Sequence, residues 1–133
     1  MLIILISLTL IGVVTIVLVN YLTSENEQTE PTIDEIVALS FDTEEMTTML
    51  KTNEFARIRL RIQVDNRKAL QEIQKRDFQV KNIINKVISD LTARDLMGSE
   101  GIENLQELIK LEINKEMQEG MIVQVYVTHR IIQ

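Results

Sequence analysis

The sequence predicts a protein of the α+β class, in which an N-terminal transmembrane helix precedes a small domain with helices packed on a small β-sheet. Three features of the 133 residues support this prediction. The chain begins with an uncharged apolar run, contains one segment of strict apolar and polar alternation, and contains two segments with the apolar spacing of a helix. We therefore divide it into an anchor at residues 1–22, an acidic linker at 23–32 and a domain at 33–133.

The anchor reads LIILISLTLIGVVTIVLVNYL over residues 2–22, and 15 of these 21 residues are Leu, Ile or Val. As a helix it is roughly 31 Å long, which matches a hydrocarbon core of about 30 Å. The hydroxyls of Ser7, Thr9 and Thr15 can hydrogen-bond to carbonyls of the preceding turn, so their cost in lipid is small. Tyr21 lies near the end, where its ring favours the headgroup region. The segment is predicted to span the membrane once.

A cleaved signal peptide is the main alternative to a retained anchor. A signal peptide has a basic start, an apolar stretch of about 7 to 15 residues and small residues before the cleavage site. This segment has no Lys or Arg in front of it, is longer, and offers Leu22 and Ser24 where small residues are needed. The retained anchor is therefore preferred. Its flank is free of basic residues as far as Lys51, and such a flank crosses a membrane readily, which favours a domain outside the cytoplasm.

Charge is unevenly distributed along the chain. Residues 23–50 contain eight acidic and no basic side chains, and the net charge of −6 comes from this segment. A chain of this charge does not fit a nucleic-acid binder, which needs a basic surface to displace counterions from phosphates. The linker, with Glu25, Glu27, Glu30 and Pro31, is interpreted as a solvated tether, and docking on a basic partner is the alternative.

Strands are predicted in three places. Residues 33–41, IDEIVALSF, suggest a short strand, and the polar stretch from there to Phe55 is interpreted as a connection. The segment FARIRLRIQV at 55–64 alternates apolar residues with Arg57, Arg59 and Arg61, which predicts a strand with one buried and one cationic face. The final segment, MIVQVYVTHRII at 121–132, is rich in β-branched residues and is predicted to be a strand.

Helices are predicted between the second and third strands. Asp65 and Asn66 supply turn and N-cap chemistry for a helix or helix pair at about 66–93, with a break near Arg76 and Asp77 as the cap of the second helix. A further helix is expected to start at Ser99, run to about residue 118 and end with Gly120 as its left-handed C-cap residue. The apolar residues with helical spacing are Val80, Ile83, Ile84, Val87, Ile88 and Leu91 in the first region, and Ile102, Leu105, Leu108, Ile109, Ile113 and Met117 in the second, where Leu111 does not fit the pattern.

Residues suited to catalysis are scarce. The chain has no Cys and one His, so thiol chemistry is excluded and a metal site lacks ligands, which predicts no cofactor and no metal. The acidic pairs Asp34–Glu35 and Glu44–Glu45 are more readily explained as solvated surface residues, and His129 as an ordinary strand residue. The four glycines are too scattered for a phosphate-binding loop. We therefore expect no enzymatic activity and no small-molecule substrate.

The row of three arginines on the predicted strand is the unusual constellation. Arg57, Arg59 and Arg61 project from one face about 7 Å apart, so acidic groups are expected opposite them. The simpler interpretation is that the protein's own helices supply these groups. The acidic residues proposed for this role are Glu72, Asp77, Glu103, Glu107 and Glu112. The functional interpretation is that the row contacts a neighbouring copy, another partner or anionic lipid.

Taken together, these segments resemble FliL, the flagellar basal-body-associated protein family, over nearly the whole chain. The resemblance rests on the single anchor, FARIRLRIQV, VKNIINKVISDLTARDL, SEGIENLQELIKLEIN and the ending VQVYVTHRIIQ. The ending is the most specific part. Its matching residues are Val123, Val125, Tyr126, Val127, Thr128, Ile131, Ile132 and Gln133.

The resemblance implies a single-pass protein of the bacterial cytoplasmic membrane at the flagellar basal body, with its domain outside the cytoplasm and a fold similar to the stomatin-like SPFH domain. It further implies a ring-like homo-oligomer beside the stator, which supports flagellar rotation, torque and swarming without catalysis. A general SPFH-like membrane scaffold unrelated to flagella is the alternative function. A membrane-bound hydrolase is a third hypothesis, for which the sequence lacks residues suited to catalysis.

Overall fold

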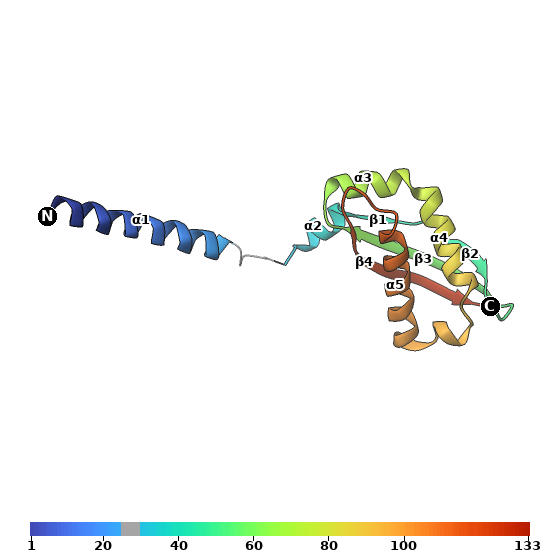
Figure 1. Cartoon of the computed structure of the whole chain (residues 1–133). Helices are drawn as coiled ribbons and strands as arrows, with labels where there is room; N and C mark the ends of the chain where they lie inside the picture. The colour runs from blue at the N-terminus through green and yellow to red at the C-terminus, as the bar shows by residue number, and fades with distance from the viewer. Residues whose placement is uncertain (25–29) are drawn as a thin grey trace. The chain divides into compact units, whose positions relative to one another are not determined.

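The protein is described by a computed structural model that covers residues 1–24 and 30–133 (Figure 1). The chain divides into two compact units, Met1–Pro31 and Thr32–Gln133. The centre of the predicted linker, residues 25–29, lies outside the described residues. The class α+β, with an apolar N-terminal helix and a small sheet, is confirmed.

In the described part of the first unit, the helix α1 runs over Leu2–Ser24. Its segment Leu2–Leu22 has a mean hydropathy of 3.1 and is long and apolar enough to cross a membrane. The predicted hydrogen bonds to carbonyls of the preceding turn are present. Ser7 Oγ donates to the carbonyl of Ile4 at 2.8 Å, and Thr15 Oγ1 donates to the carbonyl of Ile11 at 2.7 Å. These hydroxyls are satisfied within the helix, so they add little to the cost of burying it in lipid.

The sheet of the second unit is organised around β3, Phe55–Val64. On one edge β3 pairs antiparallel with β4, Ile122–Ile132, along almost its whole length. On the other edge it pairs with β1, Ser40–Asp42, and then with β2, Met46–Met49. Figure 1 shows β3 between β1 and β4. Both outer edges of the sheet are therefore formed by strands that pair with β3 alone.

The prediction of a strand over residues 33–41 is wrong in its first half. Residues Ile33–Ala38 form a short helix, α2, and the strand begins at Ser40. The cause is a capping box: Thr32 Oγ1 accepts from the N–H of Glu35 at 3.3 Å, and the Glu35 carboxylate accepts from the N–H of Thr32 at 3.0 Å. Asp34 and Glu35 also place negative charge at the positive end of the helix.

The stretch interpreted as a plain connection contains the strand β2. Met46 lies opposite Ile58 and packs against the core, while Met49 lies opposite Phe55 and is half exposed. A strand of four residues made of Met and Thr carries little periodic signal. Its pairing with β3 therefore comes from the tertiary structure.

The predicted helix pair is present as α3, Arg67–Lys75, and α4, Asp77–Ser89. Asn66 is the N-cap of α3, and its side chain accepts from the N–H of Ala69 at 2.9 Å, as predicted. The break falls at Arg76, so Asp77 is the first residue of α4 and not its cap. A short 3-10 helix, η1, follows at Arg94–Leu96.

The last helix, α5, covers Gly98–Asn114 and differs from its prediction at both ends. Its N-cap is Met97, which makes no side-chain capping bond, so Ser99 does not cap it. The helix ends before Gly120, which has φ of 154° in the connection to β4 and is not a helix C-cap. Gly101 is needed for packing, because a Cβ there would lie 2.7 Å from the carbonyl carbon of Leu96.

The hydrophobic core lies between one face of the sheet and the three helices α3, α4 and α5. The even-numbered positions of β3 from Ala56 to Val64 are all buried, as their alternation predicts. Helix α4 contributes Val80, Ile84 and Ile88, and α5 contributes Leu105, Ile109 and Ile113, which confirms both helical stripes at their central positions.

Glu72 of α3 fixes the connection between α5 and β4. Its carboxylate accepts from the N–H of Gln118 at 3.0 Å, from the N–H of Glu119 at 2.6 Å and from Nε of Arg76 at 2.8 Å. Burial acts to raise the pKa of Glu72, but the bonds from Glu119, Arg76 and Gln118 outweigh it and hold the pKa below its ordinary value.

We predict that Glu72→Gln lowers the free energy of unfolding by about 2 kcal/mol at neutral pH, because the neutral amide loses the charged bonds. A lowered folded pKa gives stability that is complete above the ordinary value of 4.5 and is lost as the pH falls below it. Chemical denaturation between pH 7 and pH 3 should therefore show a smaller loss in the variant. Glu112→Gln, which removes an exposed partner of Lys115, is the control and should cost less than about 1 kcal/mol. Equal effects of the two changes would contradict the role given to Glu72.

Candidate functional site

The face of the sheet opposite the core carries the arginine row. Arg57, Arg59 and Arg61 occupy odd-numbered positions of β3, whose even-numbered neighbours enter the core. Arg59 is exposed, and the side chains of Arg57 and Arg61 are 42% and 39% exposed. The row therefore lies on a solvent-facing surface, where its charges can be reached by another molecule.

Arg61 is paired with Asp42 of β1, which is its register partner. Nε of Arg61 donates to Oδ1 of Asp42 at 2.8 Å, and Nη2 donates to Oδ2 at 2.7 Å. This two-pronged bond lowers the pKa of Asp42 and raises the pKa of Arg61. The pair fixes both side chains on the sheet surface.

Arg57 shares one carboxylate with His129 of β4. Glu45, which precedes β2, lies 3.6 Å from Nε of Arg57 through Oε1 and 3.7 Å from Nε2 of His129 through Oε2. The expectation that the protein supplies acids to the row is correct for Arg57 and Arg61, but the partners are different. They come from β1 and from the residue just before β2, and not from the helices.

The helical acids proposed as partners are engaged elsewhere. Each of four makes an ion pair within its own helix or at its end: Glu72 with Arg76, Asp77 with Lys81, Glu107 with Lys110 and Glu112 with Lys115. These helices cover the opposite face of the sheet, so their carboxylates cannot reach the arginine row. The prediction of helical partners is therefore wrong for a topological reason.

Arg59 is the member of the row left without a carboxylate in the part of the chain that the structure describes. Its register partner on β4 is His129, whose side chain is 44% exposed. Arg59 and His129 thus lie side by side on the open face of the sheet, next to the carboxylate of Glu45. A partner with an acidic group would find an unpaired guanidinium here.

Three of the four carboxylates in the acidic pairs considered for catalysis have structural partners. Glu35 belongs to the capping box of α2, and Glu44 binds Nζ of Lys81 at 3.1 Å. Within residues 1–24 and 30–133, no group of three His, Asp or Glu side chains is placed to hold a metal ion.

The C-terminal residues that carry the family resemblance form β4. Val125 is fully buried, Tyr126 donates its hydroxyl to Oε1 of Gln63 at 3.1 Å, and Thr128 donates to the carbonyl of Arg59 at 3.1 Å. Val123, Val127, Ile131 and Ile132 are partly buried. Gln133 exchanges two backbone bonds with Phe55, at 2.7 and 2.9 Å. The pattern is explained by its pairing with β3.

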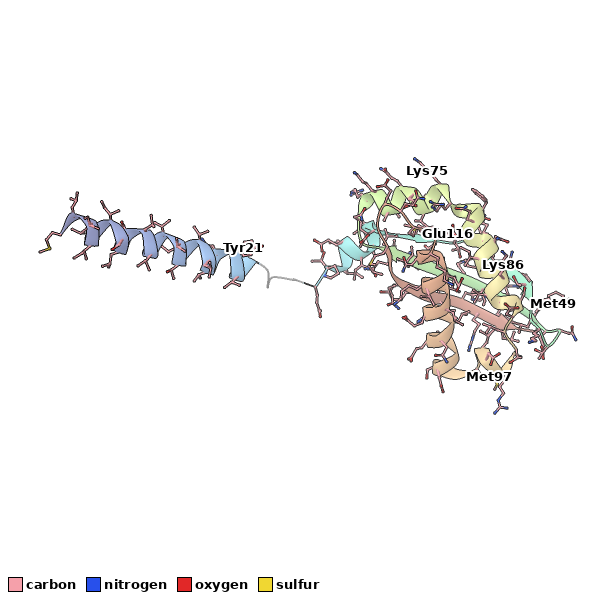
Figure 2. All side chains as sticks on the ribbon, in the orientation of Figure 1. Tyr21, Met49, Lys75, Lys86, Met97 and Glu116 are labelled. Atoms are coloured by element: carbon pink, nitrogen blue, oxygen red, sulfur yellow. The ribbon has the colours of Figure 1, made fainter. Side chains whose placement is uncertain are left out.

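A groove of about 750 Å³ lies between η1 and α5. Its apolar lining includes Met97, Leu108 and Leu111, which are 68%, 40% and 57% exposed. Figure 2 labels Met97 at the end of the domain where η1 meets α5. Leu111 was the residue that did not fit the core stripe of its helix, and that misfit was the available signal for this second surface.

The two units define a class of protein. One contains an apolar helix that is able to cross a membrane, and the other is an α+β domain whose described surface carries ion pairs. Residues 40–133, which include the whole sheet and α3, α4 and α5, match the family model "Flagellar basal body-associated protein FliL". The chain belongs to the FliL family.

Two curated relatives agree with this assignment. The chain is 39% identical to "Flagellar protein FliL" of Bacillus subtilis (strain 168) over 105 residues, which are 79% of this chain and 75% of the relative. It is 34% identical to "Flagellar protein FliL" of Aquifex aeolicus (strain VF5) over 79 residues, which are 59% of this chain and 49% of that protein.

We predict that Arg61→Gln raises the pKa of Asp42 toward its ordinary value of 3.8, because the bond that favours the carboxylate is lost. The titration can be followed by NMR on the carboxyl carbon of Asp42. Arg57→Gln is the matched control, since Arg57 binds Glu45 and should leave Asp42 unchanged. An unchanged pKa of Asp42 in Arg61→Gln would contradict the pairing.

Proposed function

We propose that this chain is a non-enzymatic accessory protein of the flagellar motor, which associates with the stator and basal body and supports rotation, torque and swarming. The observation that carries the proposal is the family match over residues 40–133, which spans β1 to the end of β4. The names of both relatives contain the word flagellar.

The proposed location is the bacterial cytoplasmic membrane, with α1 as a single-pass anchor and the domain outside the cytoplasm. The length and hydropathy of Leu2–Leu22 support the anchor. The absence of Lys and Arg from the sequence before Lys51 supports the orientation, because no positive charge holds the flank of the anchor in the cytoplasm. An anchored domain is confined to a thin layer, which raises its effective concentration for assembly.

The use of the polar groups supports a proposed role without catalysis. Among the described residues, Glu35 belongs to a capping box, and Glu44 and Glu45 each lie beside a cation. A catalytic carboxylate needs a free position beside a substrate and a pKa suited to proton transfer. The proposal accordingly includes no cofactor, no small-molecule substrate and no nucleic acid.

The proposed assembly is a ring-like homo-oligomer, and the proposed fold relationship is to SPFH domains. Arg57, Arg59 and Arg61 are the candidate contacts for a neighbouring copy or a motor protein. Arg59 is the strongest of the three, since Arg57 and Arg61 already have carboxylate partners. The family match favours this function over a general membrane scaffold unrelated to flagella.

We predict that deleting the gene reduces swimming speed, swarming and motor torque while filaments are still built. A fluorescent fusion of the full chain should form spots that coincide with motors. A diffuse membrane signal in flagellated cells, together with normal torque in the deletion strain, would contradict the motor function and favour the general scaffold.

We predict that Arg59→Gln weakens ring assembly of the full chain in lipid nanodiscs by at least about fivefold, and that changing Arg57, Arg59 and Arg61 together to Gln abolishes the ring. The reason is that an unpaired exposed guanidinium is available to an acidic group of the next copy. Mass photometry measures the assembly, and circular dichroism checks the fold. Arg67→Gln removes the same charge from exposed α3 and is the control. Equal assembly of all variants would show that the row serves the monomer alone.

A further inference from the structure

The outer edge of β4 is closed along one half and open along the other. In an antiparallel ladder, the backbone groups of alternate residues point toward the partner strand and away from it. Gln133 exchanges its bonds with Phe55, and the pairing Arg57↔Ile131 and Arg59↔His129 keeps the same parity. The backbone groups of Arg130 and Ile132 therefore point away from β3, toward the outside of the sheet.

Side chains close the first half of this edge. Asn114 of α5 both accepts from the N–H of Ile122 at 2.7 Å and donates to its carbonyl at 3.0 Å, as a neighbouring strand would. Gln124 donates to the carbonyl of Val125 at 3.2 Å, and Gln106 accepts from the N–H of Val127 at 3.0 Å. Such coverage prevents another strand from pairing between Ile122 and Val127.

The second half has no such cover within the described residues. Beyond Val127 the helix α5 supplies no further bond to the edge, and the guanidinium of Arg130 turns to the carbonyl of Leu96. The strand contains no proline and continues to Ile132. An unpaired row of strand donors and acceptors of this kind is a template for another strand.

We propose that this open half of β4 pairs antiparallel with the same segment of a second copy, about a two-fold axis at Ile131. In this register Arg130 of each copy exchanges both backbone bonds with Ile132 of the other, which gives four hydrogen bonds. Ile131 then meets Ile131 of the second copy in the non-hydrogen-bonded position between them. His129 lies opposite Gln133, so no like charges face each other.

Charge and the number of hydrogen bonds together favour this register over the two neighbouring ones. An axis at Arg130 would place two arginines directly opposite, which is destabilising. Among the residues of the given sequence, an axis at Ile132 forms one hydrogen-bonded pair instead of two. The register at Ile131 also adds apolar contact, because the partly buried Ile131 side chains of the two copies meet on the open face of the sheet.

This contact goes beyond the proposed ring and can fail independently of it. A ring is built from head-to-tail interfaces, in which two different surfaces meet. A two-fold interface instead brings a residue against its own copy. A single cysteine can therefore form a disulfide across a two-fold axis, and the chain has no native cysteine to confuse the result.

The test is disulfide formation by Ile131→Cys in the full chain, in membranes under mild oxidation. Facing residues at a non-hydrogen-bonded position have Cα atoms about 4.5 Å apart, within the range that a disulfide spans. We expect a dimer on a non-reducing gel, formed at least tenfold faster than with Tyr126→Cys. That control lies on the same strand and face, but the two copies of residue 126 would lie about 30 Å apart along the paired strands. Equal rates for the two cysteines would overturn the proposal.

A second variant tests the backbone bonds. Ile132→Pro, combined with Ile131→Cys, removes an N–H that points outward and leaves the bonds to β3 in place. We expect the dimer band to fall at least tenfold while the thermal unfolding transition remains cooperative. An undiminished band in this folded variant would overturn the pairing through backbone bonds.

Discussion

The pairing of β3 with three other strands is the constraint on which the rest of the domain depends. β3 provides the register for β1, β2 and β4, and none of these pairs with another strand. Its alternation sends one set of side chains into the core and the arginines to the opposite face. A change that shifted this strand by one residue would exchange the two faces and place charge in the core.

The same alternation governs the backbone. Even-numbered positions of β3 bond toward β1, as Leu60 does with Thr43 at 2.8 Å, and odd-numbered positions bond toward β4. The directions on β4 follow from this parity, including the groups of Arg130 and Ile132 that face outward. Thus one periodic segment of sequence determines the core, the charged face and the free hydrogen-bonding edge.

Features that depend on neighbouring residues in the sequence were predictable, and features that depend on the pairing of strands were not. The alternation of β3, the cap at Asn66 and the apolar stripes of α4 and α5 follow from periodicity and capping chemistry, and all are present. Residues 33–38 were predicted as a strand although Thr32 and Glu35 carry the spacing of a capping box, so that signal was available and missed. The partners of Arg57 and Arg61 could not be predicted, because Asp42 and Glu45 reach them only through the register of β1 and β2.

The shortness of β1 and β2 limits how far copies of this domain can grow into larger sheets. These strands have three and four residues. The edge of the sheet opposite β4 is therefore discontinuous and offers little continuous backbone for another strand to pair with. Joining two domains through β4 would cover the long edge strand of each domain and leave only the discontinuous edges of β1 and β2 exposed. Growth of the sheet, as distinct from assembly of the ring through other surfaces, would then stop at a pair of domains, and the fold would be protected from the endless stacking that leads to fibres.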